Sequence, residues 1–263
     1  MSVLIRDGVA IHYRDEGPKD AALTFVFANS LGTDFRVWDP LLPHLPEGAR
    51  VIRYDKRGHG LSDAPRAPYR MVDHIVDAAA VVHEVEAKDV IFVGLSIGGL
   101  IAQGLWSAWP ELFRGMILLD TAHKIGTTEV WNERIAAVRQ GGVEPLADVV
   151  MERWFSAEFR ARPELALWRN MLVRTTADGY AGSSAAIRDT DFTEVALSIS
   201  VPTMCVVGTE DGSTPPALVK ELASFITGAR YEEIEGVGHI PCVEAPERLG
   251  ALIASFLADA RLI

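Results

Sequence analysis

Residues 90–99 read Val-Ile-Phe-Val-Gly-Leu-Ser-Ile-Gly-Gly, and this stretch decides the fold. The first half is a continuous apolar run rich in β-branched residues, which is typical of a strand buried on both faces. The second half carries the pattern Gly-x-Ser-x-Gly at 94–98, and a helical pattern continues to Trp109. A strand, a tight glycine-rich turn and a helix in succession predict a nucleophile elbow, a turn that projects the Ser96 hydroxyl above the sheet.

Short apolar runs of the same kind recur on both sides of this elbow. They lie at residues 23–28, 51–55, 115–120 and 203–208, with a last candidate strand at 230–234. Helical patterns at 72–86 and 99–109, and a helix expected from Pro246, separate or follow them. This alternation predicts an α/β fold with a mainly parallel sheet covered by helices. The Asp7-Gly8 turn predicts an antiparallel hairpin at one edge.

The strand pattern stops between Ala122 and Val195. Apolar stripes at helical spacing occur there instead, at residues 131–140, 145–155 and 164–173. We therefore expect an all-helical cap, residues 122–195, inserted into a core formed by residues 1–121 and 196–263. Three of the six tryptophans lie in this segment, which suits a cap that lines an apolar pocket.

Composition excludes several functional classes. The 263 residues are 49% hydrophobic and 23% charged, as in a soluble globular protein. A formal charge of −11 argues against nucleic acid or an anionic membrane as a partner, although a local arginine could still hold a small anion. The N-terminus has no apolar signal segment and no run is long enough to span a bilayer, so we expect a cytoplasmic protein. Nothing in the sequence indicates an oligomeric state.

A serine hydroxyl needs a base, and His239 is the best candidate among the seven histidines. It lies in the loop 236–241 between the last expected strand and the C-terminal helix, at the sheet edge where α/β proteins bind ligands. His59 is a rival, but its Arg-Gly-His-Gly loop is better interpreted as a structural turn. His123 could line the cap entrance, and the others are expected at the surface: His12, His44, His74 and His83.

The acid that orients the base is expected directly after the strand at 203–208. Asp211 lies three residues past Gly208, and its neighbour Glu210 is a minor alternative because adjacent residues of an extended loop point apart. Asp120 also ends a strand and is a second alternative. The order Ser96, Asp211, His239 matches the serine–acid–histidine order of one class of hydrolases.

Acyl transfer also needs hydrogen-bond donors for the oxyanion that develops on the carbonyl. The backbone N–H of Ile97 follows the nucleophile and is one expected donor. The second is expected in the loop after the strand 23–28, where the N–H of Leu31 fits the position. The two cysteines, Cys205 and Cys242, lie in apolar stretches without metal-binding spacing, so we expect buried reduced thiols and no metal site.

These motifs resemble the α/β-hydrolase superfamily over essentially the whole chain. More narrowly, the chain is similar to 3-oxoadipate enol-lactone hydrolases. The segments that carry this narrower likeness are 29–34 with Trp38, 54–60, 94–99, 120–126 leading into Trp131, and the cap stretch 185–189. The resemblance implies that Ser96 attacks a lactone carbonyl with His239 as base and Asp211 fixing its tautomer, in bacterial aromatic catabolism by the β-ketoadipate pathway. It implies no metal and no organic cofactor.

The implied substrate is a small anionic lactone, so a cation should face the pocket. Arg134 lies one turn after Trp131 on an expected cap helix, and the pair are our candidates for substrate contact. The alternative is an ordinary amphipathic helix with a core tryptophan and a solvated arginine. The same framework also serves carboxylesterases, C–C bond hydrolases and cofactor-free perhydrolases, and a non-catalytic ligand receptor is an alternative of another class.

Overall fold

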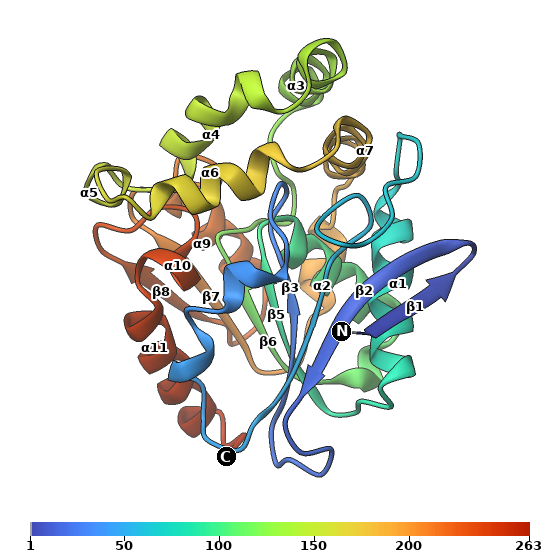
Figure 1. The fold of residues 1–263 in the computed structure, drawn as a ribbon. Coiled ribbons are helices and arrows are strands. Elements are labelled where there is room, and N and C mark those ends of the chain that lie inside the picture. Colours follow the sequence, from blue (N-terminus) through green and yellow to red (C-terminus); the bar gives the residue numbers. More distant parts are fainter. Residues whose placement is uncertain (1) are drawn as a thin grey trace.

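The computed structural model describes residues 2–263, and an eight-stranded sheet lies at its centre (Figure 1). In spatial order the strands are β1 (Ser2–Arg6), β2 (Val9–Glu16), β4 (Arg50–Tyr54), β3 (Thr24–Ala28), β5 (Val90–Leu95), β6 (Phe113–Leu119), β7 (Thr203–Gly208) and β8 (Arg230–Ile234). Neighbours from β4 to β8 are parallel, whereas β1–β2 and β2–β4 are antiparallel. The predicted α/β fold with an antiparallel edge hairpin is confirmed.

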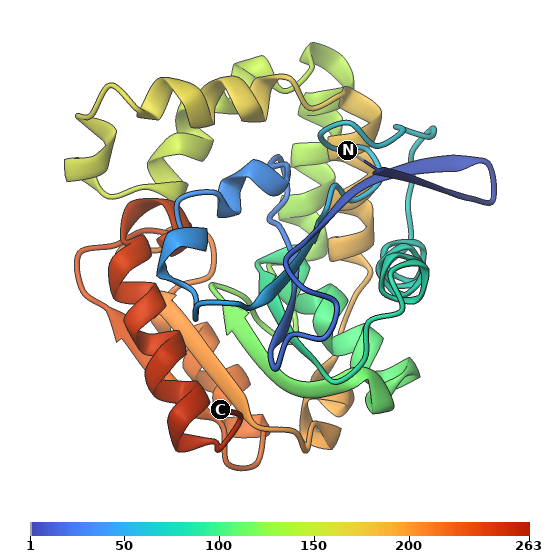
Figure 2. The same cartoon turned by 60° about the horizontal axis from the view of Figure 1, so that its bottom comes forward.

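Helices cover both faces of this sheet (Figures 1 and 2). Along one face lie α1 (Met71–Glu84), α2 (Ile97–Ala108), α8 (Thr193–Ser198) and α9 (Pro216–Phe225). The other face carries α10 (Pro241–Glu244), α11 (Pro246–Asp259) and two short 3-10 helices, η1 (Phe35–Trp38) and η2 (Leu42–His44). The residues of β3, β5 and β7 are all buried, as their apolar sequences predict.

Between β6 and β7 the chain is helical and lies over one edge of the sheet (Figure 1). This region contains α3 (Thr128–Gly141), η4 (Glu144–Leu146), α4 (Ala147–Trp154), α5 (Ala157–Arg160), α6 (Leu165–Val173) and α7 (Ala177–Arg188). The division into a core of residues 1–121 and 196–263 and a cap of residues 122–195 stays a prediction. Helix α8 crosses the second boundary.

Neither α7 nor α9 follows from the sequence patterns above. Helix α7 consists mostly of small residues, so it shows no apolar stripe. These residues are buried because the helix approaches other backbone closely: a Cβ on Gly179 would meet the carbonyl of Gly58. Helix α9 does bury one side, but the prolines at its start obscure the pattern.

Two of the histidines expected at the surface are buried, which corrects that expectation. His12 faces inward from β2, and its Nδ1 lies 2.8 Å from Oδ2 of Asp55. His74 faces inward from α1, and its Nε2 lies 3.2 Å from Oγ of Ser183. In both cases the polar partner is far away in the sequence.

Cys205 and Cys242 are buried and free, as predicted. Among residues 2–263, no helix has the length and apolar character needed to cross a bilayer.

Candidate active site

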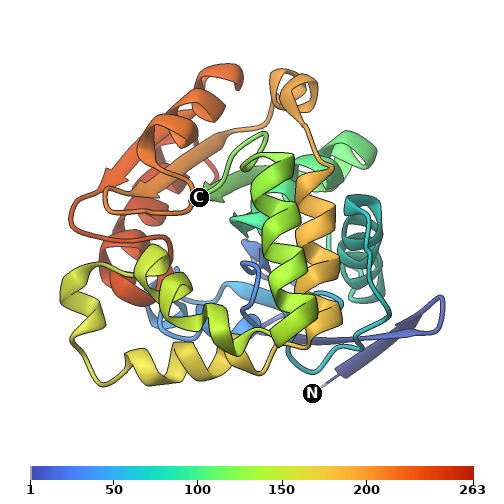
Figure 3. The ribbon, with the colours of Figure 1, turned by 90° about the horizontal axis from the view of Figure 1, so that it is seen from above.

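The carboxyl ends of the parallel strands meet at the sheet edge that faces the helical region. The elbow follows β5, the loop with Leu31 follows β3, and Asp120 follows β6. Asp211 and His239 lie in the loops after β7 and β8. This edge is where open α/β sheets bind ligands. Seen from above, α3 and α7 run side by side over it (Figure 3).

Ser96 occupies the strained turn that the sequence predicts. Its φ of 58° and ψ of −118° lie outside the backbone regions that residues other than glycine favour. The turn is held by the Ser96 N–H, which donates to Leu119 O at 3.0 Å, and by Thr121 Oγ1, which donates to Ser96 O at 2.6 Å. A Cβ on Gly94 would meet the Gly98 carbonyl, so strand and helix pack this closely only without side chains there.

The predicted acid and base are in direct contact. His239 Nδ1 lies 2.8 Å from Asp211 Oδ2, and both side chains are buried. Asp211 also accepts from the backbone N–H groups of Ser213 and Thr214 at 2.6 and 3.0 Å and from Thr214 Oγ1 at 2.7 Å. Burial alone would raise the pKa of Asp211, but attraction to His239 and these hydrogen bonds outweigh it and hold the pKa below its usual value. The arrangement suits an ionised carboxylate that orients an imidazole.

The two alternative acids are placed differently. Glu210 is exposed. Asp120 is fully buried, and its Oδ1 accepts from Gly208 N–H at 2.9 Å while its Oδ2 has no partner in the described chain. Burial and the nearby Asp211 carboxylate raise the pKa of Asp120 well above its usual value. Asp120 therefore favours its protonated form beside the Asp211–His239 pair.

Asp120, Asp211 and His239 also offer ligand atoms within 4.8 Å of one another, a spacing that a metal ion could use. In the structure two of these ligand atoms bond to each other, and Asp120 Oδ1 bonds to backbone. The expectation that neither a metal nor an organic cofactor takes part stays a prediction.

The backbone N–H groups of Leu31 and Ile97 have no hydrogen-bond partner within residues 2–263. Ile97 begins α2, where the first N–H groups have no partner inside the helix. Leu31 and Ser96 line the same cavity. Two free donors near the serine are what the predicted oxyanion hole requires.

Hydrogen bonds from the segment 54–60 hold the loop that contains Leu31. Gly32 N–H donates to His59 Nε2 at 2.9 Å, and Lys56 Nζ donates to the carbonyl oxygen of Ser30. Burial and the Lys56 charge hold the pKa of His59 well below its usual value, which keeps Nε2 free to accept. Burial also lowers the pKa of Lys56 to about 7. The rival histidine thus supports the loop rather than lining the cavity.

The cavity beside Ser96 and His239 has a volume of about 80 Å³, and the helical region forms its other wall. Trp131 and Arg134 both line it, and the Arg134 guanidinium carbon lies 5.0 Å from the centre of the Trp131 ring. Trp131 is buried and Arg134 is half-buried, so substrate contact by this pair stays a prediction beside the alternative of an ordinary amphipathic helix. Trp131 is fixed by its Nε1–H, which donates to Ile125 O at 2.6 Å.

Sequence patterns missed a second cation in this wall, Arg153, and the buried Tyr180. Neither residue belongs to a motif, so no local signal identifies them. The Thr214 hydroxyl that bonds to Asp211 was missed as well. Asp211 itself carries one local signal, because an aspartate side chain commonly accepts from the backbone N–H two residues on, here that of Ser213.

The end of α4 is tied to the loops that carry the acid and the base. His239 N–H donates to Trp154 O at 2.8 Å, and Gly212 N–H donates to Arg153 O at 3.2 Å. A Cβ on Gly238 would collide with the Trp154 carbonyl, so this contact requires glycine. Helix α4 therefore sets the position of both loops.

Comparison with known proteins agrees with this geometry. Residues 25–252 match the model of the alpha/beta hydrolase family. The chain is 33% identical to 3-oxoadipate enol-lactonase 2 of Acinetobacter baylyi over 93% of this chain and 91% of that protein. It is 30% identical to 3-oxoadipate enol-lactonase 1 of that organism, covering 96% and 94%. The crystal structure of the enol-lactonase from Burkholderia xenovorans LB400 superposes with a TM-score of 0.93 at 36% identity, covering 98% and 100%.

The resemblance inferred from the sequence motifs is therefore confirmed, both for the superfamily and for its similarity to enol-lactonases. From the strained serine after β5 to the aspartate and histidine loops after β7 and β8, the matched region includes every predicted catalytic residue. The chain belongs to the alpha/beta hydrolase family.

Proposed function

We propose that this protein is a serine hydrolase that opens 3-oxoadipate enol-lactone to 3-oxoadipate. The observation that carries the proposal is the placement of Ser96, in a strained elbow, in the same small cavity as His239, whose ring is held by Asp211. The likeness to enol-lactonases along nearly the whole chain supports the choice of substrate.

In the proposed reaction, Ser96 Oγ attacks the lactone carbonyl carbon while His239 Nε2 takes its proton. The carbonyl oxygen becomes an oxyanion that accepts hydrogen bonds from the N–H groups of Leu31 and Ile97. The C–O bond of the ring then breaks, and the ring oxygen leaves as an enolate that His239 protonates and that tautomerises to a ketone. Water, deprotonated by His239, then attacks the acyl carbon. The bond to Ser96 Oγ breaks, His239 returns the proton to that oxygen, and the acid is released.

Substrate selection is assigned to the helical wall of the cavity. The lactone carries a carboxylate, and Arg134 and Arg153 both line the cavity. Within residues 2–263, the side chain of Arg153 makes no ion pair, so its charge is available to an anion. Trp131 supplies an apolar surface beside Arg134. This wall favours a small anionic lactone, and the proposed role lies in the β-ketoadipate pathway of aromatic catabolism.

The deciding experiment follows loss of enol-lactone absorbance with the purified protein and compares it with hydrolysis of a neutral ester. We expect the lactone to be the better substrate, and we expect Ser96→Ala and His239→Ala to reduce turnover by several orders of magnitude. The matched control is Ser213→Ala, because Ser213 lines the same cavity but contributes only its backbone N–H to Asp211.

A fluorophosphonate probe separates the alternatives. Labelling of the wild type that is lost in Ser96→Ala and in His239→Ala supports a serine hydrolase. An ester turned over far faster than the lactone would instead indicate a carboxylesterase. A protein that is neither labelled nor active would indicate a ligand receptor.

A further inference from the structure

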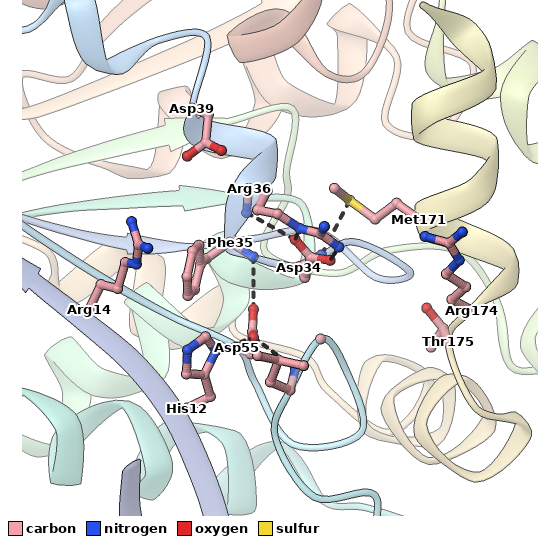
Figure 4. A pocket seen from close by; sticks show the side chains of 12 residues that line it. His12, Arg14, Asp34, Phe35, Arg36, Asp39, Asp55, Met171, Arg174 and Thr175 are labelled. Carbon is pink, nitrogen blue, oxygen red and sulfur yellow. Dashed lines mark hydrogen bonds and ion pairs between the residues drawn. The ribbon is translucent and has the colours of Figure 1, made fainter. Parts of the chain in front are cut away.

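A second cavity lies outside the catalytic one, between β2, η1 and the end of α6 (Figure 4). Its volume is about 390 Å³, which is within the range of small-molecule sites. The two cavities share no lining residue. This second cavity is therefore a separate candidate site, and it does not depend on the proposed lactonase chemistry.

The apolar lining of the cavity comes mainly from Phe35 and Met171. The Phe35 ring lies there, and the centre of the His12 ring is 5.0 Å away. The Arg53 guanidinium carbon lies 4.9 Å from the Phe35 ring centre and fixes the ring from the core side. Met171 of α6 closes the opposite wall, and its sulfur accepts from Asp34 N–H at 3.4 Å. These groups offer a contact surface for hydrocarbon rather than for water.

The three carboxylates that line the cavity already have partners. Asp34 accepts from Arg36 at 2.9 and 2.6 Å, in a bidentate pair. Asp39 pairs with Arg53. Asp55 accepts from the backbone N–H groups of Phe35 and Leu61 and contacts His12. Arginines therefore compensate the charges of Asp34 and Asp39, and Asp55 is held by backbone N–H groups and His12, so none of the three carboxylates lacks a partner.

Two arginines that line the cavity lack a strong ion-pair partner in the described chain. Within residues 2–263, the Arg174 side chain makes no hydrogen bond or ion pair, and it lines the cavity from the end of α6. Within the same residues, Arg14 makes an ion pair only with Glu16, at 3.3 Å, and both side chains are more than 40% exposed, so that pair is weak. The Arg14 guanidinium carbon also lies 5.8 Å from the centre of the Phe35 ring. Figure 4 shows Arg14 and Arg174 on opposite sides of Phe35. His12 adds a buried Nε2 that has no partner in the described chain.

We propose that this cavity binds a short-chain dicarboxylate. One carboxylate is held by Arg174 beside the unused Nη1 of Arg36, the other by Arg14, and the hydrocarbon between them contacts Met171 and the small exposed part of the Phe35 ring. A bridging ligand of this kind would connect α6 to β2 and to the segment that follows the Leu31 loop. The product of the proposed reaction belongs to this chemical class, so occupancy by product is one consequence of the proposal.

Titration calorimetry with adipate tests the proposal, with hexanoate as the matched ligand of equal length and one carboxylate. We expect saturable adipate binding, at least about tenfold weaker binding of hexanoate, and about a tenfold or greater loss of adipate affinity in Arg14→Gln and in Arg174→Gln. Arg169→Gln is the control variant. Arg169 is also on α6, but it pairs with Glu144 and Asp148, and its substitution should leave adipate affinity unchanged.

Hydrogen exchange locates the ligand independently of affinity. Adipate should slow amide exchange in residues 34–39 and 171–175. Binding that survives both Arg14→Gln and Arg174→Gln but is lost in Arg134→Gln would place adipate in the catalytic cavity and overturn the proposal. Binding only above about 10 mM, or hexanoate binding as tightly as adipate, would also overturn it. Lactone hydrolysis without adipate, measured on the same variants, tests the proposed function separately.

Discussion

The two walls of the catalytic cavity are built differently. On the sheet side, Ser96, Asp211 and His239 are buried, and hydrogen bonds to side chains or neighbouring backbone hold each of them. On the helical side, Arg134 and Arg153 line the cavity, and neither makes an ion pair within residues 2–263. One wall has its geometry fixed by the protein, while the other keeps its charge available to a ligand.

This difference separates the proposed chemistry from the proposed selection of substrate. Groups that must be aligned with the reacting atoms lie where backbone hydrogen bonds leave little freedom. Groups that attract an anion can be less rigid, because charge attraction depends less on angle than proton transfer does. Substitutions on the sheet side should therefore lower kcat, and substitutions on the helical side should mainly raise KM.

The largest expected effect distinguishes the two aspartates on the sheet side. Asp211→Asn should lower kcat about 10³–10⁴-fold, because an amide cannot hold the His239 tautomer as a carboxylate does. Asp120→Asn should change kcat by less than about tenfold, since Asp120 makes no hydrogen bond to His239. Steady-state kinetics on both variants gives the comparison. A larger loss in Asp120→Asn would assign the acid to the end of β6.

An intermediate effect is expected on the helical side. Arg134→Gln and Arg153→Gln should each raise KM for the anionic lactone about 10–100-fold, because each removes a charge-assisted contact to the carboxylate. Kinetics with a neutral ester provides the control, and its KM should change little. Equal changes for both substrates would show that these arginines act on the shape of the wall and not through charge.

The smallest effect concerns stability and pH. The raised pKa of Asp120 means that the folded protein favours its neutral form. Its stabilising contribution is complete below the usual carboxyl pKa of 3.8 and is lost as the pH rises through the folded pKa, since the unfolded chain releases the proton first. Asp120→Asn should lose less unfolding free energy than the wild type between about pH 5 and pH 8, by at most about 1.4 kcal/mol per pH unit.

Urea unfolding at the two pH values measures this difference. If the unfolding free energy changes equally with pH in the wild type and in Asp120→Asn, Asp120 is ionised in the folded state. That result would make the sheet side of the cavity more negative than described above.

The sequence was sufficient for the sheet side because each key residue follows its own strand. Parallel strands end at one edge, so a pattern that places strands also brings Ser96, Asp211 and His239 together. The same reasoning cannot find Arg153 or Tyr180. Their positions depend on how α4 and α7 pack, and α7 packs through glycine contacts that leave no apolar periodicity.

Burial of polar side chains was the other feature that local patterns could not reveal. His12 and His74 are inside because Asp55 and Ser183 provide partners from distant parts of the chain. The supporting role of His59 likewise depends on Gly32, which belongs to another loop. Pairings of this kind require the tertiary arrangement, whereas the bond from Ser213 N–H to Asp211 was within reach of a local rule.

The two carbonyl groups at the end of α4 have a consequence for engineering. Because they accept from His239 N–H and Gly212 N–H, a motion that lifts this helix would release both catalytic loops at once. We therefore expect substrate to enter and product to leave the cavity on the α3 side, while α4 stays in place. A chimaera that exchanges the helical insert for that of another hydrolase must reproduce these two carbonyl acceptors. Without them the His239 ring will lose its alignment, even though Ser96, Asp211 and His239 are all retained.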